Sequence, residues 1–436
     1  MIKKTNKEDS QKVIGENIYA LATELFPIAR SITGQGVRDT LNIIKRELPN
    51  LQLHEIQSGT SVFDWTVPLE WNIYDAYILD PEGKKFIDFK QNNLHIVSYS
   101  IPVDMKMPLE ELQNYLYSLP EQPDAIPYIT SYYNKTWGFC LTENQRNTLK
   151  QGIYTIKIDS TLEGGVLNYG ELIIQGKSRQ EVFLSTYICH PSMANNELSG
   201  PTVLTYLAKW IQRLKLLNFT YRIIFIPETI GSIVYLSRNL DYLKKNVIAG
   251  YNITCIGDDR NYSYLPTRYG DTLSDRIAKH VLKNLVPNYV SFTFLDRGSD
   301  ERQYCSPGID LPIASIMRTK YYEYPEYHTS KDDLTLISPS GLFGGYNVLQ
   351  KCIVCIESNE ILETTVLCEP QLGKRGLYPS ISTKNQTEVM ANMMNLIAYA
   401  DGKTDLVSIA NTINIPMWEL FEIISQLKEQ SLLTTI

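Results

Sequence analysis

Acidic and imidazole side chains follow a series of apolar segments in this sequence. The pairs are His190 after 182–188, Glu228 after 221–227, Asp258 and Asp259 after 247–256, and His328 in the loop after 311–317. In an open α/β sheet, the carboxyl ends of parallel strands share one edge, and loop side chains gather in the crevice above it. If the apolar segments are such strands, these side chains meet at one site.

Imidazole nitrogen and carboxylate oxygen are donors that zinc accepts while keeping a position for water. The candidate metal ligands are His190, Glu197, Asp258 (or Asp259) and His328. Zinc lowers the pKa of bound water to about 7, and a carboxylate that is not tied to the metal can then take the proton. Glu228 suits this role, because partial desolvation at a strand end raises a carboxyl pKa.

Each of these residues also has a simpler explanation. His190 could be a packed loop histidine, and Glu197 could place a favourable charge in the first turn of a helix. Asp258 and Asp259 could cap the turn that follows them. A functional site is favoured because these side chains all follow the ends of successive expected strands.

The elements that would position these residues indicate an α/β fold, with a mostly parallel sheet flanked by helices. The expected strands are 153–158, 170–174, 182–188, 221–227, 247–256 and 311–317, and the expected helices are 201–216, one beginning at 231, and 340–361. The segment 51–140 alternates polar and apolar residues and contains the turn 81–84, so we expect an inserted antiparallel β domain. The α/β domain then covers 1–50 and 141–375.

Three short helices are expected near the C-terminus, over 390–399, 406–412 and 417–430, and 383–436 is predicted to be a winged-helix domain. Its third helix contains Glu419, Glu422 and Glu429 against only Lys428. Because phosphate attraction would be poor, we expect a protein contact or homo-oligomer role here, and nucleic acid is an unlikely partner.

The composition of the chain argues against several classes of function. The chain has 436 residues, 43% hydrophobic and 20% charged, with a net charge of −7 that gives no support to polyanion binding. No run of eighteen apolar residues occurs and no signal peptide is visible, so we expect a cytoplasmic protein without membrane contact. Seven scattered cysteines indicate reduced thiols. Arg30 is expected to anchor its loop and His95 to be packed in a strand.

The order of motifs resembles the zinc aminopeptidases of the MH clan. The motifs are the strand before His190, Asn-Asn-Glu-Leu-Ser-Gly (195–200), Pro-Glu-Thr-Ile-Gly-Ser (227–232), Ile-Gly-Asp-Asp (256–259), Gly-Ser-Asp-Glu (298–301) and Tyr-His-Thr (327–329). The whole chain is similar to a bacterial aminopeptidase-like family with an inserted β domain and a C-terminal winged helix. Segments that resemble that family's own motifs are 64–68, 93–95, 137–140 and 368–373.

The resemblance implies a histidine ligand at His190, a general base at Glu228, and a later aspartate–histidine ligand pair at Asp258 and His328. Two positions depart from the clan. Its metal-bridging aspartate falls on Asn196 and its second glutamate falls on Thr229. An amide oxygen is a poorer zinc donor than a carboxylate. One zinc ion is therefore favoured over two, held by His190, Glu197 and His328 with Asp258 as a ligand or supporting partner.

The expected function is a zinc-dependent, aminopeptidase-type hydrolase that cleaves an amide bond beside a free amine through metal-activated water. Its substrate would be a peptide or an aminoacyl small molecule. Asp300 or Glu301 could bind the amine and Tyr327 could wall the pocket, although 297–302 could instead be a solvated turn. The alternative is a weakly catalytic or non-enzymatic binding scaffold linked to polysaccharide biosynthesis.

Overall fold

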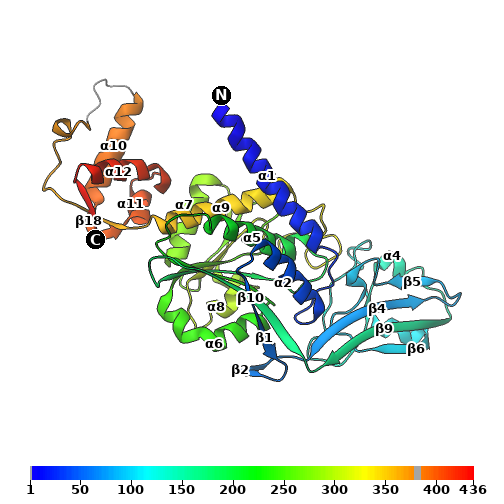
Figure 1. Ribbon diagram of the computed structural model, residues 1–436. Coiled ribbons are helices and arrows are strands. Elements are labelled where there is room, and N and C mark those ends of the chain that lie inside the picture. Colours follow the sequence, from blue (N-terminus) through cyan, green and yellow to red (C-terminus); the bar gives the residue numbers. More distant parts are fainter. Residues whose placement is uncertain (1, 378–383) are drawn as a thin grey trace. The chain divides into compact units, whose positions relative to one another are not determined.

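The computed structural model of the protein describes residues 2–377 and 384–436 (Figure 1). Its internal contacts divide the chain into two compact units. Unit 1 contains Met1–Gly270 and Val290–Asn347, and unit 2 contains Asp271–Tyr289 and Val348–Ile436. All of the candidate site residues belong to unit 1.

Unit 1 is built on an eight-stranded sheet. In spatial order its strands are β1 (Gln52–Gln57), β10 (Val166–Ile174), β12 (Thr220–Ile226), β11 (Glu181–Tyr187), β13 (Val247–Asn252), β16 (Ile313–Met317), β14 (Ser263–Leu265) and β15 (Val290–Ser291). The four central strands, from β12 to β16, are parallel, whereas β10 and β14 run antiparallel to their central neighbours. Strands β11 and β12 are buried along their whole length, as strands covered on both faces must be.

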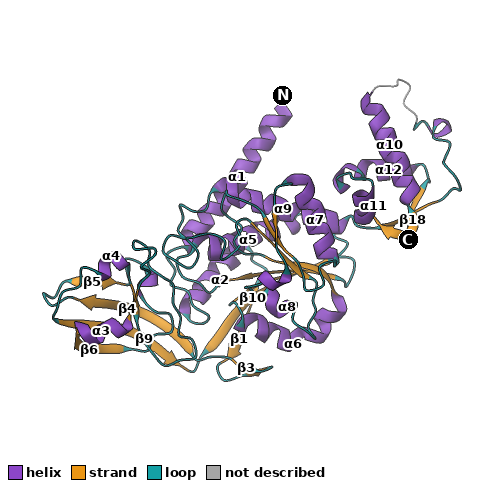
Figure 2. Ribbon diagram, turned by 180° about the vertical axis from the view of Figure 1, so that it is seen from behind, coloured by secondary structure: helices purple, strands orange, loops and turns teal. Residues whose placement is uncertain are grey.

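Helices cover both faces of this sheet. On one side lie α1 (Ile2–Leu25), α2 (Gln35–Glu47) and α5 (Ser199–Ile211), and on the other lie α6 (Ile230–Asn246) and α8 (Glu301–Tyr304), as Figures 1 and 2 show. Helix α2 places Val37, Leu41 and Ile44 on one buried stripe, which gives it an apolar face toward the sheet. The predicted fold class, a mostly parallel sheet with flanking helices, is confirmed.

A second, antiparallel sheet is inserted between the first strands of unit 1. Its strand order is β5 (Lys85–Asp88), β4 (Glu70–Leu79), β9 (Ile153–Glu163) and β6 (Val103–Pro108). Around it lie β2 (Ser61–Val62), β3 (Trp65–Thr66), β7 (Leu116–Tyr117), β8 (Phe139–Cys140), α3 (Leu109–Leu112), α4 (Glu143–Arg146), η1 (Asn93–His95) and η2 (Gln113–Tyr115). Two strands cross the expected limits 51–140, since β1 joins the large sheet and β9 is central to the small one.

Several elements differ from the expected ones at their ends; helix α5, for example, ends at Ile211 rather than at 216. Strand β13 ends at Asn252 rather than at 256, because Cys255 has a positive φ of 47° that an extended strand cannot contain. Helix α9 (Pro339–Glu357) stops four residues early, before strand β17 (Ile361–Thr364). The third C-terminal helix is divided into a turn, η6 (Met417–Glu419), and the helix α12 (Phe421–Glu429).

Unit 2 combines a small sheet with short helices. Besides β17, η6 and α12, it contains α7 (Leu273–Leu285), η5 (Gly373–Arg375), α10 (Lys384–Tyr399), β18 (Asp401–Asp405), α11 (Leu406–Thr412) and β19 (Leu433–Thr435). Strands β18, β17 and β19 form one antiparallel sheet. The unit begins before the predicted winged-helix domain at 383–436, because α7 and the residues after 348 share its contacts.

A buried histidine joins the helices of unit 2. His280 in α7 is bonded through Nδ1 to Oδ1 of Asn411 at 2.7 Å, and its Nε2 accepts the backbone N–H of Met417 at 2.8 Å. An Nε2 that accepts is unprotonated, so the ring is neutral and Nδ1 is its donor. Burial lowers the pKa of His280 below its usual value.

None of the helices in the described part of the chain is long and apolar enough to cross a membrane.

The lowered pKa of His280 predicts that unit 2 loses stability in acid. The unfolded chain takes up a proton near pH 6.5, whereas the folded histidine does not. The contribution of His280 to the free energy of unfolding is therefore complete above about pH 6.5 and declines as the pH falls below that value. We expect His280→Ala to cost about 1–3 kcal/mol at pH 8, since it leaves the buried N–H of Met417 unpaired. Urea unfolding with hydrogen exchange at Met417 measures both effects. His54→Ala, in unit 1, is the control and leaves unit 2 unchanged; an equal loss in both variants would contradict this account.

Candidate functional site

The parallel pairing of β11 and β12 brings two predicted site residues together. In that register Tyr187 lies opposite Ile226, and both strands end there. The loops that follow therefore start side by side, one with His190 and the other with Glu228. The distance from His190 Nε2 to Glu228 Oε2 is 3.7 Å.

His328 arrives at the same place from the loop after β16. Its ring centre is 5.5 Å from that of His190, and Tyr128 presents its ring edge-on to both histidines at 5.3 and 5.2 Å. The ring of Tyr327 stacks on His328 at 3.9 Å. Burial lowers the pKa of both histidines to about 3, with the charge of Arg30 as a second cause at His190 and that of His190 at His328. Both imidazoles are therefore neutral, the form that binds metals.

Glu197 contacts the other nitrogen of His190. It lies in the π-helical turn η3 (Ala194–Leu198), and its Oε2 accepts the backbone N–H of His190 at 3.0 Å and lies 2.9 Å from the ring Nδ1. An oxygen that already accepts one N–H is best matched by a protonated Nδ1. This tautomer leaves the lone pair on Nε2, the nitrogen that faces Glu228. Glu197 thus orients the imidazole from behind.

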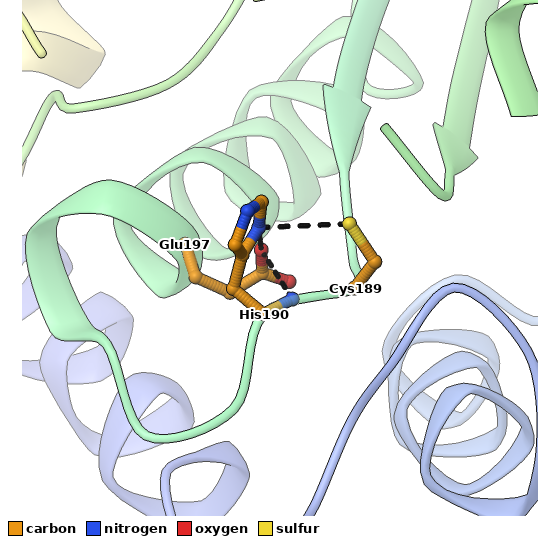
Figure 3. A group of neighbouring side chains, drawn as sticks. All are labelled: Cys189, His190 and Glu197. Carbon is orange, nitrogen blue, oxygen red and sulfur yellow. Dashed lines mark hydrogen bonds and ion pairs between the residues drawn. The ribbon is translucent and has the colours of Figure 1, made fainter. Parts of the chain in front are cut away.

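Cys189 completes a close group with these two residues, shown in Figure 3. In the described part of the chain, Cys189, His190 and Glu197 are the group whose potential metal-ligand atoms all lie within 4.8 Å of one another. Burial raises the pKa of the Cys189 thiol well above its ordinary value, so it stays protonated and is a poor ligand. Its sulfur instead accepts the backbone N–H of Glu228 at 3.2 Å. We therefore interpret the group as a hydrogen-bonded support for His190 and Glu228.

A buried arginine stands behind this support. The Nε of Arg30 donates to the carbonyl oxygen of His190 at 3.0 Å and lies 3.7 Å from Oε1 of Glu197, while Nη1 donates to the carbonyl of Leu25 at 2.7 Å. The expectation that Arg30 is a loop anchor is confirmed, since only 1% of it is exposed. His95 is likewise packed, with Nδ1 2.8 Å from the carbonyl oxygen of Cys140, but it lies in the turn η1 rather than in the expected strand.

Asp258 lies apart from the histidines. One of its oxygens accepts from the side chain of Asn195 at 3.1 Å and from the backbone N–H of Thr319 at 2.9 Å, and the other accepts from the Thr319 hydroxyl and from the N–H of Arg260. It does not line the pocket that contains the histidines. The expected ligand position is not reached, because β13 ends four residues earlier than expected and the chain turns at Cys255. Asp259 instead accepts from Ser338 and Ser340.

At the two positions that depart from the clan, Asn196 and Thr229, the side chains make hydrogen bonds within the protein. Oδ1 of Asn196 accepts from Tyr187 at 2.7 Å, inside the core, and the hydroxyl of Thr229 accepts from Arg302 at 2.6 Å. The turn that contains Asn196 is held by Asp332, whose carboxylate accepts the N–H groups of Asn195 and Asn196. Neither position offers a free donor for a second metal.

Asp300 and Glu301 point into the protein rather than into the pocket. Asp300 accepts the N–H of Thr229 at 2.7 Å and the hydroxyl of Ser232 at 2.8 Å, and both acids are fully buried. Glu301 accepts from Gly298, Ser299, Tyr321 and Asn252. Of the three predicted substrate contacts, Tyr327 alone lines the pocket. The neighbouring Arg302, to which the sequence assigned no role, lines it too.

The pocket has a volume of about 440 Å³. Its lining is largely aromatic: Ile32, Trp65, Tyr128, Thr130, Tyr132, Tyr133, His190, Glu228, Thr229, Ile230, Gly298, Arg302, Tyr322, Tyr327 and His328. The inserted residues 65 and 128–133 supply one wall. Burial, with the charge of Asp300, raises the pKa of Glu228 to about 8. A carboxyl group with such a pKa can exchange protons near neutral pH.

Two comparisons by sequence identify the family. Residues 19–359 match the model described as a domain of unknown function (DUF4910), and residues 360–435 match a winged helix-turn-helix model. The chain belongs to the DUF4910 family. A relative from Clostridium acetobutylicum named "Putative polysaccharide biosynthesis protein with aminopeptidase-like domain" is 48% identical over 398 residues, which cover 91% of each chain.

Comparison with solved structures supports the family assignment and the fold. The crystal structure of a "putative peptidase" from Clostridium acetobutylicum matches over 100% of both chains, with 43% identity and a TM-score of 0.93. A zinc aminopeptidase from Bacillus subtilis, at 12% identity, matches 78% of this chain and 94% of its own with a TM-score of 0.56. The second likeness shows the fold alone. The expected resemblance to zinc aminopeptidases with a C-terminal winged helix is confirmed.

The buried pair of Arg30 and Glu197 predicts a large loss of stability when it is broken. We expect Arg30→Met to cost about 3–5 kcal/mol, because it leaves the Glu197 carboxylate buried beside a methionine. The double variant Arg30→Met/Glu197→Leu should recover part of that loss. Chemical denaturation measures all three proteins. The control is Arg46→Met, at an exposed ion pair with Glu24, which should change stability by less than about 1 kcal/mol. An Arg30 variant as stable as this control would refute the anchoring role.

Proposed function

We propose that this protein is a zinc-dependent hydrolase of the aminopeptidase type that cleaves an amide bond in a peptide or aminoacyl small molecule. The observation that carries the proposal is the meeting of two neutral imidazoles and one carboxyl group of raised pKa in a single pocket. The three side chains come from separate loops, and no packing requirement explains why all three face the same space.

Two imidazoles could hold one zinc ion. The ring centres of His190 and His328 are 5.5 Å apart, and both rings are neutral, the form that binds zinc. Glu197 on the far nitrogen of His190 matches the carboxylate that commonly orients a metal-binding imidazole. We therefore assign His190 and His328 to the metal and Glu197 to the support of His190.

A zinc ion held there would polarise a carbonyl oxygen and acidify a water molecule. Glu228 would take a proton from the attacking water as the water oxygen bonds to the carbonyl carbon, and would return it to the amine nitrogen as the carbon–nitrogen bond breaks, since its pKa lies close to neutral pH. The sulfur of Cys189, which accepts the N–H of Glu228, and the strained residue Thr229 (φ 62°) fix where this carboxyl group points. The ring of Tyr128 closes the space beside the two histidines.

The expected free amine has one possible partner in the pocket. Among the described residues that line it, Glu228 is the only carboxylate, since Asp300 and Glu301 are bonded inside the protein. An amine beside the scissile bond would thus have to lie against Glu228. This specificity is the finer part of the proposal, and aminoacyl reporters with free and acetylated amines test it.

A non-enzymatic binding protein is the second candidate. The hydrogen bonds at Asn196 and Thr229 favour it, because they occupy two positions where the zinc aminopeptidase pattern has ligands. The name of the Clostridium acetobutylicum relative would connect such a protein with polysaccharide biosynthesis. Metal content and turnover separate the two candidates.

Zinc should copurify at about one ion per chain and depend on both histidines. We expect His190→Ala and His328→Ala to lose most of the metal, whereas the control His54→Ala keeps it. Elemental analysis of the purified proteins measures the ratio. Chelation should also lower the melting temperature of the wild type, since the metal binds only the folded state. Wild-type protein without zinc, or with zinc that survives in both variants, would exclude the assigned site.

Turnover should depend on Glu228 without any loss of metal. We expect Glu228→Gln to lower kcat on aminoacyl reporters by about 10²–10⁴-fold, because the amide cannot accept the proton. The matched control is Glu323→Gln, an exposed carboxylate in the loop before Tyr327. Wild-type protein that binds zinc and hydrolyses no aminoacyl reporter would support the binding protein instead.

A further inference from the structure

The pocket contains a positive charge that the proposed chemistry does not use. Arg302 is the only arginine or lysine among the described residues that line it. Its Nη2 donates to the hydroxyl of Thr229 at 2.6 Å, and the ion pairs of the described residues do not include it. A guanidinium carries five donors in a rigid plane. Among the described residues, Thr229 is the one side-chain partner of this guanidinium, so its other donors are open to a ligand in the pocket.

The start of helix α8, which holds Arg302, is built around buried interactions. Thr229, its anchor, has a positive φ of 62° and donates its N–H to Asp300 at 2.7 Å. Asp300 also accepts from Ser232, and Glu301 accepts from two backbone N–H groups of its own loop. A free surface arginine would need no such frame. Strained residues that the surrounding structure over-determines cluster at ligand sites.

The mouth of the pocket is aromatic and open. Trp65, Tyr133 and Tyr322 are 41%, 52% and 66% exposed, and the Trp65 and Tyr133 rings are 6.1 Å apart. Exposed aromatic rings around a concave site supply contact area for an apolar or ring-bearing ligand. Arg302 therefore stands where a polar group of the ligand would need a partner.

We infer that Arg302 is a specificity residue that binds a carboxylate on the substrate, so that the pocket selects acidic amides over their uncharged counterparts. This inference rests on the proposed function of the same pocket. A carboxylate suits one guanidinium, because two parallel hydrogen bonds match its two oxygens. A phosphate dianion has a larger charge, and Arg302 is the only cationic side chain among the described residues that line the pocket. An ammonium group at this position would be repelled.

The test uses two probes that differ only in charge, hippurate and its primary amide hippuramide. Both carry an aromatic ring and an amide, and calorimetry measures their binding to the zinc-loaded Glu228→Gln protein, in which turnover is suppressed. We expect hippurate to bind roughly tenfold to a hundredfold more tightly, as charge-assisted hydrogen bonds require. In Glu228→Gln/Arg302→Gln this preference should disappear, and Arg302→Lys should keep part of it.

The matched control is Arg297→Gln in the same background. Arg297 belongs to the same loop, but it stacks on Phe294 and does not line the pocket. It should keep the full preference for hippurate. Equal binding of the two probes, no binding of either, or the same preference in the Arg302→Gln protein would overturn the inference. Tighter binding of phenyl phosphate than of hippurate would overturn the choice of carboxylate.

The two proposals can fail separately. Preference for hippurate in a protein that hydrolyses no reporter would overturn the hydrolase and keep the carboxylate site. Hydrolysis of aminoacyl reporters without any preference between the probes would keep the hydrolase and overturn the role of Arg302.

Discussion

The pocket depends on the parallel register of β11 and β12. Backbone hydrogen bonds fix Tyr187 opposite Ile226, so the two loops leave the sheet as neighbours and His190 meets Glu228 at 3.7 Å. A shift of one residue in this register would reverse every side chain of one strand between the faces of the sheet. Because both strands are buried throughout, such a shift would disrupt the side-chain packing on both faces. The core therefore determines the position of the candidate chemistry.

The region behind His190 contains charges that a simple core would exclude. Arg30 and Glu197 are buried within 3.7 Å of each other, and taking both from water costs free energy that their attraction only partly returns. The structure keeps them because together they hold the carbonyl oxygen, the N–H and the ring of one residue, His190. Fixing an imidazole from three directions selects which nitrogen faces the pocket. This function accounts for the cost, and an apolar pair of the same volume could not supply it.

The sequence was sufficient to place residues that directly follow buried strands. His190 and Glu228 could be found because apolar segments of seven residues predict the strand ends closely. Asp258 could not be placed, because it lies six residues after β13 and the turn at Cys255 has no clear sequence signal. The direction of Glu197 was also hidden, since spacing alone does not show which ring nitrogen a carboxylate meets. Asp300, Glu301 and Arg302 are adjacent in sequence. Only the turn of the short helix α8, which the sequence did not reveal, directs the two acids into the protein and the arginine to the surface.

Two arginines and two glutamates lie close to the two histidines. Arg30 is buried beside Glu197 behind the histidines, and Arg302 lines the pocket together with Glu228. In the proposed site, one dication would add a charge that an acidic substrate could partly neutralise. A second dication would need the carboxylates that Asn196 and Thr229 do not provide, and buried charge without a partner is strongly disfavoured. At one of these positions, Thr229, the hydroxyl is instead the anchor of Arg302.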